Sequence, residues 1–289
     1  MNFIQKRNIF FALSALVIIF GISYGLITGL HYGLDFTGGT MLQIDFGKTV
    51  PVEDIRKITD KFDTKASIIH AGANKEEVII KSIVDLDNQE RNEIFTKFKE
   101  EYGLKDEALI QSQKIGPAIG NEIQRKALLS IVLATIGILI YTSFRFEVKF
   151  GIAAIIALIH DALVVFAVYA AFHIPLDSTF IAAILTIVGY SINDTIVIFD
   201  RIRENLKLMK KESYEDIANI SIKQTLSRTI NTTLTTLIAI VTLYILGVDA
   251  VKDFAFPLIV GMIAGTYSSV FIASPIWYLL KTKSKESIV

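Results

Sequence analysis

The chain contains no cysteine among its 289 residues, so disulfide bonds, thiolate metal sites and cysteine nucleophiles are excluded. Its four histidines, His31, His70, His160 and His173, are scattered and lack the spacing of metal ligands. HExxH, GxSxG and Walker motifs are also missing, which argues against a protease or an ATPase. We therefore predict no catalytic residue, no metal and no cofactor, and the chain is not expected to be an enzyme.

Net charge is absent as well, because 29 Lys and Arg balance 29 Asp and Glu. Residues 31–122 hold 17 acidic and 12 basic side chains, so the positive excess lies in the rest of the chain. No basic surface stands apart from membrane-flanking segments, and a nucleic-acid partner is not expected. Apolar residues are abundant, at 52% with a mean hydropathy of +0.50, which is typical of a protein in the lipid bilayer.

Six apolar runs are long enough to span a bilayer, which takes about 20 residues. They lie near residues 8–30, 127–144, 150–172, 179–199, 229–248 and 254–280. The first run is too long for a signal peptide and no small-x-small cleavage site follows it, so an uncleaved helix is predicted. We predict a first transmembrane helix at 1–30, an outer domain at 31–124, and a five-helix transmembrane domain at 125–289. A cytoplasmic loop is predicted at 200–228, with a helical stretch at 214–226.

Lys and Arg gather at one set of helix ends, including Lys6, Arg145 and Lys281, whereas the loop 173–178 has none. Arg125 and Lys126, at the opposite end of the second span, are an exception. The positive-inside rule then predicts a multi-pass protein of the cell (inner) membrane, with both termini in the cytoplasm and residues 31–124 outside.

The outer segment has the pattern of a small folded domain. Strands are predicted at 40–46, 66–70, 77–84 and 108–115, and helices at 52–62 and 87–102. The succession β-α-β-β-α-β is ferredoxin-like. The following segment 114–126 has apolar spacing that suggests an amphipathic run at the outer interface. The fold class is thus a six-span α-helical membrane protein with one ferredoxin-like α+β extracytoplasmic domain.

Two charged residues stand inside apolar runs. Asp194 lies five residues before Phe199, at the end of the fourth span, and Arg228 lies five residues after Lys223, before the fifth. At about 1.5 Å per residue both would be some 7–8 Å inside, and antiparallel neighbours would bring them level. A charge at such depth needs a partner, a wet cavity or a function. One hypothesis makes Asp194 a proton carrier switched by Arg228; in the alternative, Arg228 extends to the interface and Asp194 bonds to a hydroxyl.

Further polar residues in the spans form a possible secondary relay. His160 and Asp161 are adjacent midway along the third span, Asn193 precedes Asp194, and Thr232 shares a helix face with Arg228. A histidine beside a carboxylate can pass protons, but buried polar side chains also fix helix packing. Both interpretations stay open for this group.

Four strings carry a resemblance to a known family. They are GLDFTGGT at 33–40, KIGPAIGNEIQRKA at 114–127, VGYSINDTIVIFDRIREN at 188–205 and SRTINTTLTTL at 227–237. With six spans and one outer domain, the chain resembles the SecF branch of the SecD/SecF family, RND-type membrane proteins of bacterial protein export. The resemblance covers essentially the whole chain.

The resemblance implies partners and a role that composition does not. It implies pairing with SecD, a homologous six-span protein, and association with the SecYEG channel, YajC and the SecA motor. It also implies that proton flow drives the export of an unfolded polypeptide, with Asp194 and Arg228 matching the positions linked to proton passage. Because the chain ends soon after its sixth span, SecD is expected to be separate.

Two other functions stay open at this point. An RND-type subunit exchanging small molecules for protons would usually have larger outer domains than this chain. A non-transporting scaffold of the channel would use Asp194 and Arg228 for assembly rather than for protons.

Overall fold

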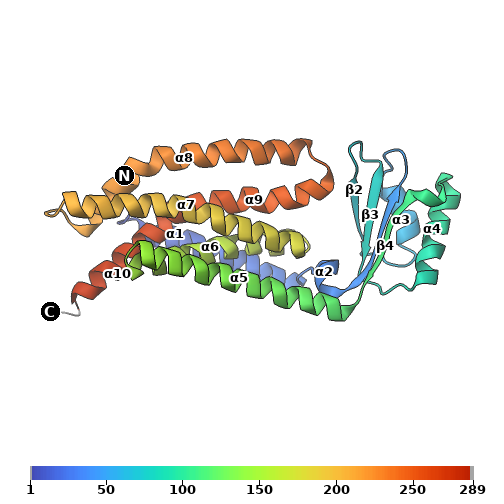
Figure 1. The fold of residues 1–289 in the computed structure, drawn as a ribbon, viewed down its shortest axis with the longest axis horizontal. Helices are drawn as coiled ribbons and strands as arrows, with labels where there is room; N and C mark the ends of the chain where they lie inside the picture. The colour runs from blue at the N-terminus through green and yellow to red at the C-terminus, as the bar shows by residue number, and fades with distance from the viewer. Residues whose placement is uncertain (1, 287–289) are drawn as a thin grey trace.

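A bundle of long helices carries a small sheet domain at one end (Figure 1). The computed structural model describes residues 2–286. Within them, six helical segments are long and apolar enough to cross a membrane, as the sequence predicts. They are α1 (Arg7–Thr28), α5 (Pro117–Arg145), α6 (Val148–Phe172), α7 (Ser178–Leu208), α8 (Tyr214–Leu246) and the continuous run of α9 (Asp249–Ser268), η2 (Ser269–Ala273) and α10 (Ser274–Glu286).

The head domain, residues 39–115, contains a four-stranded antiparallel sheet in the order β2-β3-β1-β4. Its elements are β1 (Gly39–Asp45), α3 (Val52–Thr59), β2 (Ser67–Ala71), β3 (Glu77–Ser82), α4 (Asn88–Tyr102), η1 (Asp106–Ala108) and β4 (Leu109–Ile115). This is the predicted β-α-β-β-α-β succession. Helices α3 and α4 lie on the side of the sheet that faces away from the bundle (Figure 1).

Alternating burial along the strands builds the core of the head domain. Leu42 and Ile44 of β1 and Val78 and Ile80 of β3 are buried, and they pack in one cluster with residues of α3 and α4 such as Phe98. Because side chains alternate between the faces of a strand, the opposite sheet face turns to the bundle.

Helix α4 begins at a capping box. The Asp87 carboxylate accepts a hydrogen bond from the Glu90 amide at 2.8 Å, and the Glu90 carboxylate accepts one from the Asp87 amide at 2.8 Å. Gly103, at φ 65°, ends the helix in the left-handed conformation. These contacts satisfy terminal backbone groups that would otherwise lack partners.

The bundle has an inner layer and an outer layer. Helices α6, α7 and α9 bury many of their side chains, whereas α1, α5 and α8 expose most of theirs. Glycines permit close approach in the interior: a Cβ at Gly21 would lie 2.5 Å from the Ala167 carbonyl oxygen, and one at Gly265 would lie 2.8 Å from the Ser191 Cβ. Small residues at such crossings are typical of packing between membrane helices.

A backbone joint ties the head domain to the bundle. The amide of Gly33 donates to the Leu176 carbonyl at 2.7 Å, and the Leu176 amide donates to the His31 carbonyl at 2.9 Å. The short helix α2 (Leu34–Thr37) follows this joint. The stretch 33–40 therefore connects α1 to the sheet.

Two predicted connections are helical instead. Most of the segment 200–228, predicted as a cytoplasmic loop with a helical stretch at 214–226, belongs to α7 and α8, which leaves only residues 209–213 between them. The predicted helical stretch is confirmed as the start of α8. The side-chain amide of Asn205 donates hydrogen bonds to Ser221 and Gln224, both at 2.8 Å, and these hold the two helices together there. The segment 114–126 contains no separate interfacial helix, because Pro117 starts α5 directly after β4, at a position where its missing N–H is harmless.

We predict that Gly21→Ala destabilises the bundle, because the new methyl group would meet backbone atoms of Ala167 that cannot yield. The expected loss in the free energy of unfolding is about 1–3 kcal/mol, measured by unfolding in detergent micelles. Gly137→Ala is the matched control, since a Cβ there has nothing within 4 Å and alanine favours a helix by about 1 kcal/mol. Equal stability of the two variants would contradict the packing described for α1 and α6.

Candidate functional site

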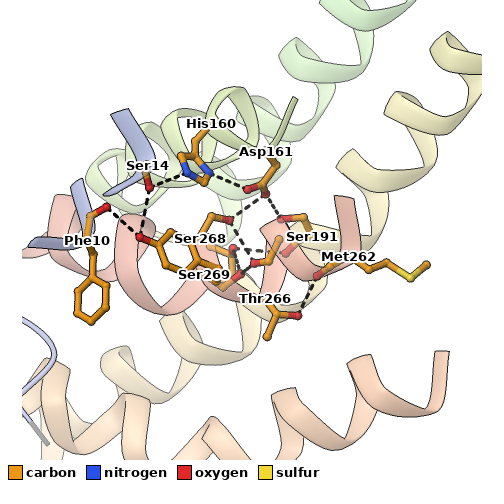
Figure 2. Close-up of polar contacts among 12 residues, drawn as sticks. Phe10, Ser14, His160, Asp161, Ser191, Met262, Thr266, Ser268 and Ser269 are labelled. Atoms are coloured by element: carbon orange, nitrogen blue, oxygen red, sulfur yellow. Dashed lines mark hydrogen bonds and ion pairs between the residues drawn. The ribbon is translucent and has the colours of Figure 1, made fainter. Parts of the chain in front are cut away.

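Asp161 lies at the centre of a polar network inside the bundle (Figure 2). Its side chain is fully buried. One carboxylate oxygen, Oδ2, accepts hydrogen bonds from the Ser191 hydroxyl of α7 at 2.6 Å and from the Ser268 hydroxyl of α9 at 2.8 Å. The other, Oδ1, lies 3.0 Å from Nδ1 of His160. Three helices therefore share one carboxyl group.

A directed chain of hydrogen bonds continues from His160 to α1. The Tyr267 hydroxyl donates to the Phe10 carbonyl at 2.8 Å, and the Ser14 hydroxyl donates to the Tyr267 oxygen at 3.3 Å. Because the Ser14 hydroxyl has already donated its hydrogen, its oxygen accepts from Nε2 of His160, 2.9 Å away. With Nε2 as a donor, a neutral His160 has no hydrogen on Nδ1. A hydrogen bond between Nδ1 and the Asp161 carboxyl therefore needs one more proton, either on Nδ1 or on the carboxyl oxygen. The pair can therefore hold a proton on either residue.

Asp194 has a different environment. It is 3% exposed, and its Oδ2 accepts a hydrogen bond from the Thr233 hydroxyl of α8 at 3.3 Å. Thr233 shares a second hydrogen bond, of 2.7 Å, with Thr266 of α9. Asp194 thus contacts a hydroxyl pair that joins the two helices packed beside α7.

Arg228 is not level with Asp194. Its side chain is exposed, and within residues 2–286 no ion pair within 4.0 Å joins it to Asp194, although its charge acts on the carboxylate through space. Two hydrogen bonds set the register of α7 and α8. The Tyr190 hydroxyl donates to the Thr232 carbonyl at 3.0 Å, and the Asn205 side chain donates to the Ser221 hydroxyl. This register places Arg228 about one helical turn nearer to residues 209–213 than Asp194. The predicted alignment was wrong because both helices extend beyond the residues taken as their ends.

The remaining predicted residues separate into two groups. His160 and Asp161 are in direct contact, as their adjacency suggests. Thr232 is half-buried and its hydroxyl bonds to the Arg228 carbonyl at 3.0 Å, within its own helix. Asn193 is exposed on the outside of α7. The structure therefore brings His160 to Asp161, and it places the Thr232 hydroxyl close enough to Asp194 to act on its carboxylate as a hydrogen-bond donor beside Thr233. Among residues 2–286, Asn193 makes no side-chain bond to either buried network.

Sequence reasoning missed the hydroxyl groups of the last span. Thr266, Ser268 and Ser269 all bond to buried groups, and the Ser269 hydroxyl lies 2.8 Å from that of Thr195 on α7. Ser269 opens a π-helical stretch, 269–273, a local form often found at functional sites. The dense run Gly265-Thr266-Tyr267-Ser268-Ser269 inside an apolar segment was the available signal.

Chemically, the site offers two buried carboxyl groups: Asp161 is bound by two hydroxyls and a histidine, and Asp194 by a threonine hydroxyl. A carboxylate removed from water without a cation costs several kcal/mol as an ion. Such a group is suited to binding a proton in one conformation and releasing it in another. The exposed Arg228 is a cation within one turn of Asp194, so a modest helix shift would change the charge balance there.

Comparison with known proteins identifies relatives of this arrangement. The family model "Protein export membrane protein SecD/SecF, C-terminal" matches residues 95–283, and "SecD/SecF GG Motif" matches residues 24–50. SecF of Calditerrivibrio nitroreducens is 36% identical over 290 residues, covering 99% of this chain and 95% of that protein. SecF of Pseudomonas aeruginosa is 34% identical over 288 residues, covering 100% and 94%.

Longer relatives match over part of their length. SecDF of Bacillus subtilis is 37% identical over 284 residues, which is 97% of this chain but 38% of that protein. The crystal structure of SecDF from Thermus thermophilus, described as a translocon-associated membrane protein, superposes with a TM-score of 0.84 at 37% identity, over 98% of this chain and 39% of that one. The chain thus spans well under half of these SecDF proteins.

We predict that Ser191→Ala destabilises the bundle, because Asp161 loses one of its buried donors. A hydrogen bond to a charged group contributes about 1.5–3 kcal/mol, and the free energy of unfolding in micelles is expected to fall by that amount. Thr186→Ala is the control, since this hydroxyl on the same helix is exposed and bonds only to the Ala182 carbonyl. An unchanged Ser191→Ala protein would show that Asp161 does not depend on this contact.

Proposed function

This chain belongs to the SecD/SecF family of protein export membrane proteins, and on that premise we propose that it is the SecF subunit of a Sec protein translocase. In this role it works with SecD beside the SecYEG channel, with YajC and SecA as further partners. It uses proton flow across the membrane to drive or complete export of unfolded polypeptides, without enzymatic chemistry of its own. SecF relatives that match this chain over nearly their whole length support the SecF role.

The exposed side of α8 supports a partner in the membrane. Arg228, Asn231 and Thr235 are exposed there, and Thr232 and Thr236 are half-buried. Hydrocarbon cannot satisfy a guanidinium or an amide at this depth, so protein or water has to cover this side. A second six-span unit, SecD, placed against α7 and α8 would enclose Asp194 and Arg228 in one polar interior.

The distribution of basic side chains supports the orientation. Arg145, Arg201 and Arg203 lie at the end of the bundle remote from the head domain, where Arg145 and Arg203 contact Asp200 at 3.8 and 2.6 Å. We place this end and both termini in the cytoplasm, and the head domain outside, by the positive-inside rule.

Asp194 is the proposed proton carrier, and its buried contact with Thr233, without a cation in direct contact, is the observation that carries this proposal. Arg228 is the switching partner, which a helix shift of about one turn brings toward the carboxylate. The His160–Asp161 pair is a secondary relay that holds a proton beside α1. One charge crossing 100 mV supplies about 2.3 kcal/mol for such a cycle.

We predict that Asp194→Asn abolishes proton-driven export, because an amide cannot take up and release a proton. The assay is export in membrane vesicles under an imposed proton gradient, with co-purification of SecD as the measure of assembly. Asp200→Asn is the control, since Asp200 lies farther along α7 in a half-exposed ion-pair cluster. Full activity of Asp194→Asn would refute the mechanism. Lost assembly would favour a scaffold, and drug sensitivity after deletion would favour a small-molecule exporter.

We predict that Thr233→Val slows proton-driven export about tenfold, the effect of losing one hydrogen bond of about 1.5 kcal/mol to a charged group. The substitution keeps the shape of the side chain and removes the hydroxyl that contacts Asp194. Thr242→Val is the matched control, because Thr242 is exposed on the same helix, about two turns farther from Asp194, and its hydroxyl donates to the Ile238 carbonyl. Equal rates for both variants would separate Thr233 from the proton site.

A further inference from the structure

The head domain and the bundle meet in a seam with two charged contacts. On β3, Lys81 lies 3.9 Å from Asp177, the residue that caps α7. On β2, Nδ1 of His70 lies 3.5 Å from Oδ2 of Asp249, the first residue of α9. The backbone joint at Gly33 and Leu176 lies in the same region of the seam as Asp177. One contact therefore involves a permanent cation, and the other a histidine that can gain or lose charge.

The hydrogen bonds of His70 determine where its proton is. Nε2 lies 2.7 Å from the Val50 carbonyl, and a carbonyl oxygen only accepts, so Nε2 carries a hydrogen in every protonation state. Neutral His70 therefore presents the bare lone pair of Nδ1 to a carboxylate oxygen, and the two repel. Protonation places a hydrogen on Nδ1 and converts the contact into an ion pair.

The groups around this contact leave one carboxylate oxygen for the histidine. From the β1–α3 connection His70 faces the Val50 carbonyl, and from α9 it faces Asp249. Asp249 is itself served by Lys252, whose Nζ lies 3.0 Å from Oδ1, and by the charge of Lys75 in the β2–β3 turn. Lys252 contacts Oδ1, so Oδ2 is the oxygen of Asp249 that faces Nδ1 of His70.

We propose that His70 and Asp249 form an acid-strengthened latch between the head domain and α9. Histidine ordinarily changes charge between about pH 5 and 8, so proton binding closes the latch and rising pH opens it. His70 is 9% exposed, which means that opening the latch is needed to hydrate it fully. The head domain then pivots on the backbone joint at Gly33, which does not titrate.

The latch acts on the helix that serves both buried carboxyl groups. Asp249 begins α9, and the same helix carries Thr266 and Ser268, which reach the Asp194 and Asp161 networks. The proton concentration at the head-domain side is in this way connected to the position of α9. This last connection rests on the proposed proton function, whereas the latch itself does not.

The test measures the distance between the head domain and the bundle as a function of pH. The chain has no cysteine, so Lys97→Cys on α4 and Glu212→Cys beyond α7 give unique positions for spin labels, both exposed. In the full chain in lipid nanodiscs, electron–electron distance distributions are recorded at about pH 5.5 and about pH 8, on either side of an ordinary histidine titration. The docked population is expected to fall about two- to fivefold at the higher pH, the range supplied by one partly exposed ion pair.

Asp249→Asn and His70→Gln are both expected to remove the pH dependence. Asp253→Asn, one turn along α9, and His31→Gln, a histidine elsewhere in the seam, are matched controls that should keep it. Asp249→Asn leaves the bond from His70 to Val50 intact, so it remains informative if His70→Gln misfolds. A native distribution that is unchanged between the two pH values overturns the latch, and so does a pH response that survives Asp249→Asn. Neither result bears on Asp194 and the export assay.

Discussion

Hydrocarbon cannot solvate a carboxyl group, and the bundle is arranged around two of them. Asp161 has hydrogen-bond partners on its own helix, on α7 and on α9, and Asp194 reaches α9 through Thr233. For these short hydroxyl side chains to reach, the helix backbones have to approach closely. Gly265 beside Ser191 meets that need, so the small residues and the polar residues of the interior depend on one another.

The same requirement extends outside the bundle. On the exposed side of α8, the side chains of Arg228 and Asn231 make no hydrogen bond or ion pair within residues 2–286. In the proposed complex, SecD covers these exposed polar side chains of α8 and provides their partners. Proton carriage, the assembly of two six-span units and the exposed arginine are then consequences of one physical constraint.

Sequence patterns alone were sufficient for the large features. Six spans followed from the lengths of apolar runs, since only helices satisfy their own backbone groups in lipid. The strand and helix succession of the head domain followed from alternation and from local signals such as Asp87, Glu90 and Gly103. The adjacency of His160 and Asp161 was also readable, because it depends only on position along one helix.

Tertiary structure decided which residues meet across helices. Arg228 lies about a turn away from Asp194 because the register of α7 and α8 is set by contacts such as Asn205 with Ser221, beyond the apolar runs. Ser14, Thr266 and Ser268 became partners of the site through the rotation and crossing of their helices. A one-dimensional pattern specifies how deep a residue lies and which face it shares. The neighbour on the next helix is determined by packing of whole surfaces, and that information is distributed over the chain.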